Sequence, residues 1–280
     1  MPAAYARPEL LASVDWVAEN ITRASLRVVD CRWRPDGSGA RLFASGHIPT
    51  AVYLDWAEDF TDPTDPTPYQ LAGPEKVAAA LGRAGIGDGM TVVLYDDTGS
   101  LPAARIWWSL QAYGLDSVRI LDGGWPAWRE TGRPASAAHI APERASFTPR
   151  ADPSRRLSTS DVRALLGSDR VDLVDVRNPA EYAGQQGSSS RLGHIPGSVN
   201  LPVVLLTEPG GQRFQPPAVL ARLVTEKGLR RSQRIVTYDG TGVGAAKAAF
   251  ALALLGFTNV AVYDAGWAEW GERLDLPLNR

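Results

Sequence analysis

Short runs of hydrophobic residues recur along the chain, and each ends at polar or turn-forming residues. They cover residues 26–29, 91–94 and 118–121 in the first half, and 171–174, 234–237 and 260–263 in the second. Near-continuous hydrophobic runs of this length are typical of strands that are buried on both faces of a parallel sheet. The pattern therefore predicts buried parallel strands in each half of the chain.

Segments with helical patterning separate these runs. Four helices are expected, at residues 74–84, 102–113, 160–166 and 245–255. Pro74 suits the first turn of its helix, and Ser160 is the expected N-cap of the third. Because strands alternate with helices, the predicted fold class is α/β, with open, mainly parallel sheets flanked by helices.

The two halves of the chain resemble each other. Three pairs of matching segments occur in the same order: 28–32 with 173–177, GHIP at 46–49 with GHIP at 193–196, and 93–128 with 236–270. A repeat of this length indicates two whole domains, since solenoid repeats span about 20–50 residues. We expect a first domain at 1–134, a proline-containing linker at 135–156 and a second domain at 157–280.

Composition narrows the chemistry. The 280 residues include one cysteine, Cys31, and three histidines, so an intramolecular disulfide and a zinc site with several thiolates are excluded. The net charge of −2 argues against nucleic acid as a partner, and no hydrophobic stretch is long enough for a bilayer. We expect a cytoplasmic protein without membrane association, metal or cofactor.

The turn after residues 234–237 is the first candidate site. It runs Tyr-Asp-Gly-Thr-Gly-Val-Gly over 238–244 and then enters a predicted helix. Glycines let backbone N–H groups converge, and a helix N-terminus adds partial positive charge. This turn therefore predicts an anion cradle at the carboxyl end of the sheet. The matching turn at 96–102 has one glycine and two carboxylates, and it is expected to hold an anion less well.

These motifs identify the chain as similar to the rhodanese superfamily, and to its tandem-domain thiosulfate and 3-mercaptopyruvate sulfurtransferases. The resemblance covers nearly the whole chain and includes both GHIP words, the Asp-x-Arg strand ends and the closing segment at 262–270. It implies an inactive first domain and a second domain with a catalytic cysteine at the start of the glycine-rich loop. At that position this chain has Asp239, and the first copy has Asp96.

A carboxylate cannot replace the thiolate, because sulfur transfer requires a soft nucleophile that becomes a persulfide. Asp239 has two interpretations. It is a fixed charge that satisfies the converging N–H groups and lowers its own pKa, or it is a general base or metal ligand. Cys31 is a poor substitute, because its position predicts a small buried side chain outside the glycine-rich loop.

The predicted substrate-binding residues combine the loop with two arginines that the resemblance places beside it. They are Gly240, Thr241, Gly242, Val243, Gly244, Arg177 and Arg191. The alternative for the arginines is an ion pair with Asp239 or Glu181. Lys247 is expected either at the surface or as a second cation at the mouth of the site.

The histidines and tryptophans are interpreted as structural. His47 and His194 belong to the repeated GHIP words, and His139 lies in the linker, where solvent exposure is expected. The tryptophans fit helix and interdomain packing.

The sequence thus predicts a sulfurtransferase-family protein that has lost persulfide-based sulfur transfer. Its partner would be a small anionic sulfur compound or a sulfur-relay protein. The alternative is a non-catalytic module that binds an anion or another protein.

Overall fold

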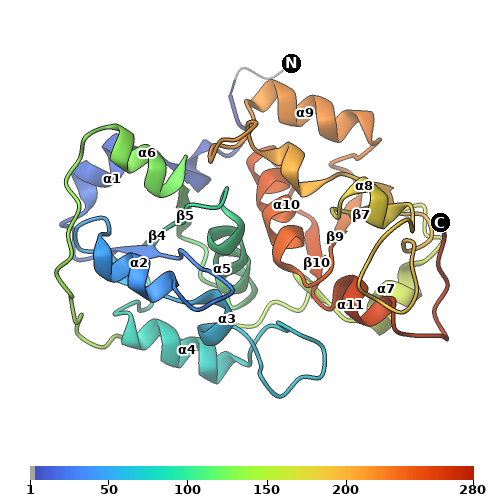
Figure 1. Ribbon diagram of the computed structural model, residues 1–280, viewed down its shortest axis with the longest axis horizontal. Helices are drawn as coiled ribbons and strands as arrows, with labels where there is room; N and C mark the ends of the chain where they lie inside the picture. Colours follow the sequence, from blue (N-terminus) through green and yellow to red (C-terminus); the bar gives the residue numbers. More distant parts are fainter. Residues whose placement is uncertain (1–3) are drawn as a thin grey trace.

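The computed structural model describes residues 4–280 and has two lobes, each built on a five-stranded parallel sheet. In the first lobe the strand order is β1-β5-β4-β2-β3, and in the second it is β6-β10-β9-β7-β8. Every pairing within the two sheets is parallel. Figure 1 shows the lobes side by side, with α5 and α10 where they meet. The predicted α/β fold with two homologous domains is confirmed.

The first lobe contains twelve of the elements. They are η1 (Pro8–Leu10), β1 (Leu11–Ala12), α1 (Val14–Asn20), β2 (Leu26–Asp30), α2 (Gly39–Ser45), β3 (Val52–Tyr53), α3 (Trp56–Asp59), α4 (Pro74–Arg83), β4 (Thr91–Tyr95), α5 (Leu101–Ala112), β5 (Val118–Leu121) and α6 (Gly124–Glu130).

The second lobe repeats the arrangement with some replacements. Its elements are β6 (Arg156–Leu157), α7 (Thr159–Leu165), β7 (Val171–Asp175), α8 (Pro179–Tyr182), β8 (Val199–Asn200), η2 (Val203–Leu206), α9 (Pro217–Glu226), β9 (Arg234–Tyr238), α10 (Val243–Leu254), β10 (Val260–Tyr263) and α11 (Gly266–Trp270).

The six predicted strands form the centres of the two sheets. Four of them, β2, β4, β7 and β9, extend one residue further than predicted, to an aspartate or a tyrosine. The prediction that Ser160 caps its helix is wrong. The N-cap of α7 is Ser158, whose hydroxyl accepts the N–H of Asp161 while the Asp161 carboxylate accepts the N–H of Ser158.

The segment predicted as a linker has no helix, and its strand content is confined to the start of β6 at Arg156. It runs along the first lobe, where Ser136 forms a bridge with His47 and Phe147 is buried in the core. The boundaries at 134/135 and 156/157 remain a prediction.

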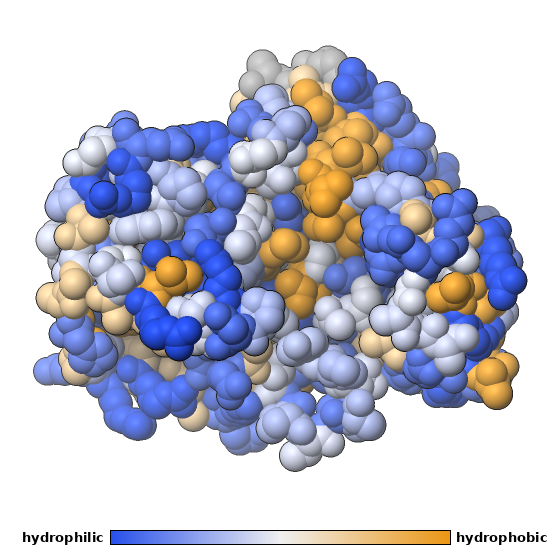
Figure 2. Space-filling model, viewed as in Figure 1, coloured by the Kyte–Doolittle hydropathy of each residue, from blue (hydrophilic) through white to orange (hydrophobic). Residues whose placement is uncertain are grey.

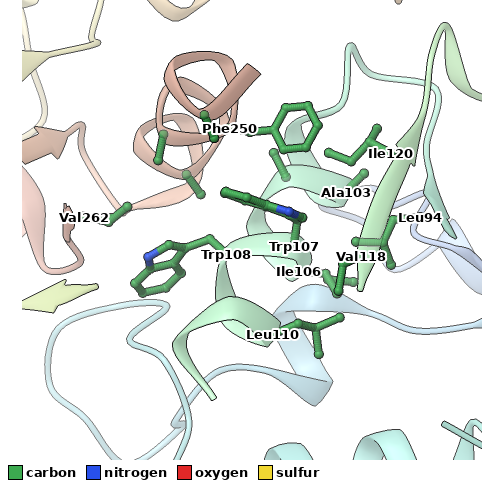
Figure 3. Packing of buried hydrophobic residues seen from close by; sticks show 14 of the residues in the cluster. Leu94, Ala103, Ile106, Trp107, Trp108, Leu110, Val118, Ile120, Phe250 and Val262 are labelled. Carbon is green, nitrogen blue, oxygen red and sulfur yellow. The ribbon is translucent and has the colours of Figure 1, made fainter. Parts of the chain in front are cut away.

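One hydrophobic cluster joins the two lobes. It includes residues of both central helices, and the ring of Trp107 on α5 meets that of Phe250 on α10 edge-on, with centroids 5.0 Å apart (Figure 3). Residues 102–112 of α5 and 244–254 of α10 are all buried, so both helices are enclosed on every side. On the face seen in Figure 2, hydrophobic residues also gather where the lobes meet. The interface between the lobes is therefore an extension of the core.

Candidate functional site

The predicted anion cradle is formed by the turn between β9 and α10. Gly242 takes the left-handed conformation, with φ of +83°. A Cβ on Gly242 would lie 2.7 Å from both Arg105 Nη1 and Asp264 Oδ1, so only glycine fits there. A Cβ on Gly244 would lie 2.9 Å from an oxygen of Asp239. The aspartate therefore occupies the space that the glycines leave open.

The backbone N–H groups of the turn converge on the Asp239 carboxylate. Oδ1 accepts the N–H groups of Thr241, at 3.1 Å, and of Gly242, and Oδ2 accepts the N–H of Gly244 at 2.8 Å. The cradle thus has an anion, and that anion is the protein's own side chain. Any other anion at these three donors would have to displace a carboxylate fixed to the same loop.

Burial raises the pKa of Asp239, and this outweighs the opposing effects of the three N–H groups and of the positive charge of Arg105. The prediction that Asp239 would lower its own pKa is therefore wrong. The surroundings of the carboxyl group disfavour its charged form by more than the three hydrogen bonds favour it.

The first lobe has the same arrangement in the turn between β4 and α5. The Asp96 carboxylate accepts the N–H groups of Thr98 and Ser100, each at 2.9 Å, and of Ala103 at 3.0 Å. Ser100 adopts a φ of +63°, the left-handed conformation that Gly242 has in the second lobe. Burial raises the pKa of Asp96 as well. The two turns are more alike than their glycine contents predicted.

The side chain of Arg177 contacts several groups within the second lobe. Its side chain is buried, pairs with the Asp175 carboxylate at 2.6 Å and donates to the Gly193 carbonyl at 2.7 Å. Its guanidinium carbon also lies 4.4 Å from the centroid of a Trp267 ring. Arg32 makes the corresponding contacts in the first lobe, so the arrangement is a property of the fold repeated in both domains.

These contacts correct one expectation about Arg177. An ion pair with Asp239 or Glu181 was expected as its alternative role, whereas its carboxylate partner is Asp175, two residues before it on the same strand end. A role for Arg177 in substrate binding remains a prediction, and its described hydrogen bonds go to other groups of the protein.

Arg191 lies against the end of the chain. Its guanidinium donates to the carbonyl of Arg273 and, at 2.8 Å, to that of Leu276. Its own carbonyl accepts the indole N–H of Trp267 at 3.3 Å. The hydrogen bonds of its side chain therefore hold the segment after α11, and its predicted contact with a substrate has no support among them.

Two cations at the interface between the lobes complete the surroundings of the loops. Lys247 was expected at the surface or at the mouth of the site, but it is only 3% exposed and points toward the first lobe. Arg105, which the sequence patterns did not single out, is fully buried and donates from the first lobe to Asp264 and to the Gly242 carbonyl. The signal was present, since Arg105 and Lys247 occupy matching positions in the duplicated segment.

The histidines and the cysteine have the structural surroundings that the sequence predicted. His47 stacks on Phe43 and His194 on Tyr182, and in each case Nδ1 is hydrogen bonded to the carbonyl of the stacking partner. Cys31 is completely buried, and burial raises the pKa of its thiol. His139 is exposed.

No group of three or more metal-binding side chains is found within residues 4–280. Over the same residues, no helix has both the length and the hydrophobicity needed to cross a membrane.

Comparison with known proteins agrees with the two-domain fold. The model of the rhodanese-like domain family matches residues 13–131 and again 158–273. The chain is 30% identical to the 3-mercaptopyruvate sulfurtransferase of Escherichia coli strain K12, over 94% of this chain and 95% of that protein. It is 33% identical to the sulfur carrier protein TtuD of Thermus thermophilus, over 98% of each chain.

A solved structure supports the same assignment. The crystal structure of SseA from Escherichia coli, a 3-mercaptopyruvate sulfotransferase, is similar with a TM-score of 0.84 and 28% identity, over 92% of this chain and 98% of that one. The chain therefore belongs to the rhodanese family, and its two rhodanese-like domains are close to those of the thiosulfate and 3-mercaptopyruvate sulfurtransferases.

Proposed function

We propose that this chain is a member of the sulfurtransferase family that does not transfer sulfur through a persulfide, and that it acts by binding a protein partner. The observation that carries the proposal is the Asp239 carboxylate, which accepts the N–H groups of Thr241, Gly242 and Gly244. Sulfane-sulfur transfer requires a thiolate that takes up sulfur, and a carboxylate forms no such intermediate.

The single cysteine gives no alternative nucleophile. Cys31 is completely buried in the first lobe, and its Sγ lies 3.7 Å from the carbonyl of Val29. Burial raises the pKa of its thiol, so the reactive thiolate is disfavoured.

Two non-catalytic functions are compared, binding of a protein and binding of a small anion, and binding of a protein is favoured. The three donors that an anion would need already bind Asp239, and a second negative charge there would be repelled. On η2, which contacts α10, Val204 and Leu205 are 72% and 42% exposed. They are two of the four large hydrophobic residues that are exposed within residues 4–280, and contiguous exposed hydrophobic surface is a feature of protein-binding sites.

The test compares the natural chain with Asp239→Cys in a thiosulfate and cyanide assay. In the variant, the new thiolate attacks the sulfane sulfur of thiosulfate and displaces sulfite, which leaves a persulfide. Cyanide then takes the outer sulfur as thiocyanate and regenerates the thiolate. We expect a persulfide adduct by mass spectrometry and thiocyanate formation from the variant, and neither from the natural chain.

Asp96→Cys is the matched control, because Asp96 holds the corresponding position and also accepts three backbone N–H groups. It is 2% exposed, and the side chain of Gln212 from the second lobe binds the N–H of Gly99 in its loop. We expect no thiocyanate from this variant. Turnover by the natural chain at a rate similar to that of Asp239→Cys would overturn the proposal.

A further inference from the structure

The two central helices each contain one buried cation. Arg105 lies on α5 and is completely buried, and Lys247 lies on α10 and is 3% exposed. Both helices are otherwise enclosed and mostly hydrophobic. Moving a charged group out of water costs several kcal/mol unless partners compensate it. The contacts of each cation should therefore explain why both domains have a buried cation at the same position.

Arg105 reaches from the first lobe into the second. Its Nη1 donates to Asp264 Oδ1 at 2.6 Å and to the Gly242 carbonyl at 3.3 Å, while Nη2 donates to the Tyr69 carbonyl at 2.7 Å. Gly242 is the residue whose left-handed conformation lets the N–H groups turn toward Asp239. The guanidinium of Arg105 thus binds the carbonyl of Gly242, and the N–H of the same residue binds the Asp239 carboxylate.

Lys247 reaches in the opposite direction. Its Nζ lies 3.4 Å from the hydroxyl of Thr207 and 3.5 Å from where a Cβ on Gly99 would be, beside the first-lobe turn. Burial lowers the pKa of Lys247 to about 8, against the influence of the Asp96 carboxylate. The amine has a long hydrogen bond to a hydroxyl, and the negative charge that acts on it belongs to the other domain.

We propose that each loop is completed by a cation from the other domain, with Arg105 as a positioning residue of the 239–244 loop and Lys247 as a positioning residue of the 96–102 loop. The two loops are then coupled through the contact between α5 and α10. This inference does not depend on the sulfur chemistry proposed above, since it concerns how the loops are held and charged.

The crossed arrangement predicts a crossed response. The positive charge of Arg105 acts to lower the pKa of Asp239, and that of Lys247 acts to lower the pKa of Asp96. Burial and the loop N–H groups are the other main influences on the pKa of each carboxyl group. Removing one cation should therefore raise the titration midpoint of the carboxyl in the opposite lobe and leave the other midpoint unchanged.

The experiment follows both carboxyl groups by carbon-13 NMR during a pH titration of the full chain, with resonances assigned from Asp239→Asn and Asp96→Asn. We expect Arg105→Gln to raise the midpoint of Asp239 alone, and Lys247→Met to raise that of Asp96 alone. Arg105→Lys keeps the charge and should hold the Asp239 midpoint nearer to that of the natural chain.

Arg156→Gln is the matched control for Arg105. Arg156 also pairs with Asp264, at 3.1 Å, and its described hydrogen bonds go to the first-lobe residues Gln70 and Leu71. Its removal should leave Asp239 unchanged. If Arg105→Gln does not fold, the carboxyl midpoints of Lys247→Met and Arg105→Lys test the proposal. Unchanged midpoints in the cation variants, or equal shifts of both carboxyls in any one of them, would overturn the proposal.

Discussion

Removing the Asp239 side chain tests how firmly the loop depends on its own carboxylate. In Asp239→Ala, the N–H groups of Thr241, Gly242 and Gly244 lose their acceptor. A buried donor left without a partner costs about 1–3 kcal/mol, so three of them set an upper range of roughly 3–9 kcal/mol.

Two effects reduce this value. Residues 239–241 are partly exposed, so water can reach some of the donors. The variant also avoids the burial of a carboxyl group, which in the natural chain raises the pKa of Asp239. We expect a net loss of about 2–4 kcal/mol, or a drop in melting temperature of roughly 5–10 °C for a chain of this size.

Thermal unfolding followed by circular dichroism measures the loss, and added sulfate tests its cause. An anion that binds the vacated donors stabilises the native state by about 2.7 kcal/mol at 100 times its Kd. The natural chain and Asp96→Ala control for the general effect of sulfate, since Asp96 is 2% exposed and Gln212 from the second lobe accepts the N–H of Gly99 in its loop. A melting temperature of Asp239→Ala equal to that of the natural chain, with no specific response to sulfate, would refute the reasoning.

Three other predictions concern pH, the arginines and the helix cap. Burial raises the pKa of Asp239 above its ordinary value of 3.8, so the stability of the natural chain relative to Asp239→Asn is greatest below pH 3.8 and falls as the pH rises through the raised pKa. Urea unfolding at several pH values measures this difference in stability, and a difference that grows as the pH rises would contradict the prediction. Arg177→Met should lower the stability by about 3–5 kcal/mol because it leaves the buried Asp175 carboxylate unpaired, whereas Arg191→Ala should lower it by about 1 kcal/mol. Equal melting temperatures of the two variants would show that the ion pair of Arg177 is worth no more than the hydrogen bonds of Arg191. Ser158→Ala should cost about 1 kcal/mol and Ser160→Ala less than about 0.5 kcal/mol, and the reverse order in thermal unfolding would restore Ser160 as the cap.

The strands of both sheets were predictable because burial on two faces leaves a plain signal. A short run of hydrophobic residues such as 91–94, bounded by turn residues, is typical of a buried strand, and the duplication supplied an independent check on each element. The four edge strands were not predicted, since β1, β3, β6 and β8 are each two residues long and leave no periodic pattern.

The candidate site was harder to predict, because its outcome depends on competing contacts. The glycines of 240–244 predicted converging N–H groups, but a sequence does not state which group those donors bind. The direction of the Asp239 pKa depends on burial against hydrogen bonding, and burial follows from how the lobes pack. The roles of Arg105 and Lys247 depend on the same packing, since each cation acts on a loop of the other domain.

A direct measurement can show whether the chain with Asp239 transfers sulfur through a persulfide. Thiocyanate formation from thiosulfate and cyanide, followed for the natural chain and Asp239→Cys under identical conditions, compares a carboxylate with a thiol at one position of one fold. We predict no turnover by the natural chain above the Asp96→Cys control, and turnover with a persulfide adduct for Asp239→Cys. Turnover by the natural chain would contradict the account. A folded Asp239→Cys chain without an adduct would show that more than residue 239 separates this loop from an active one.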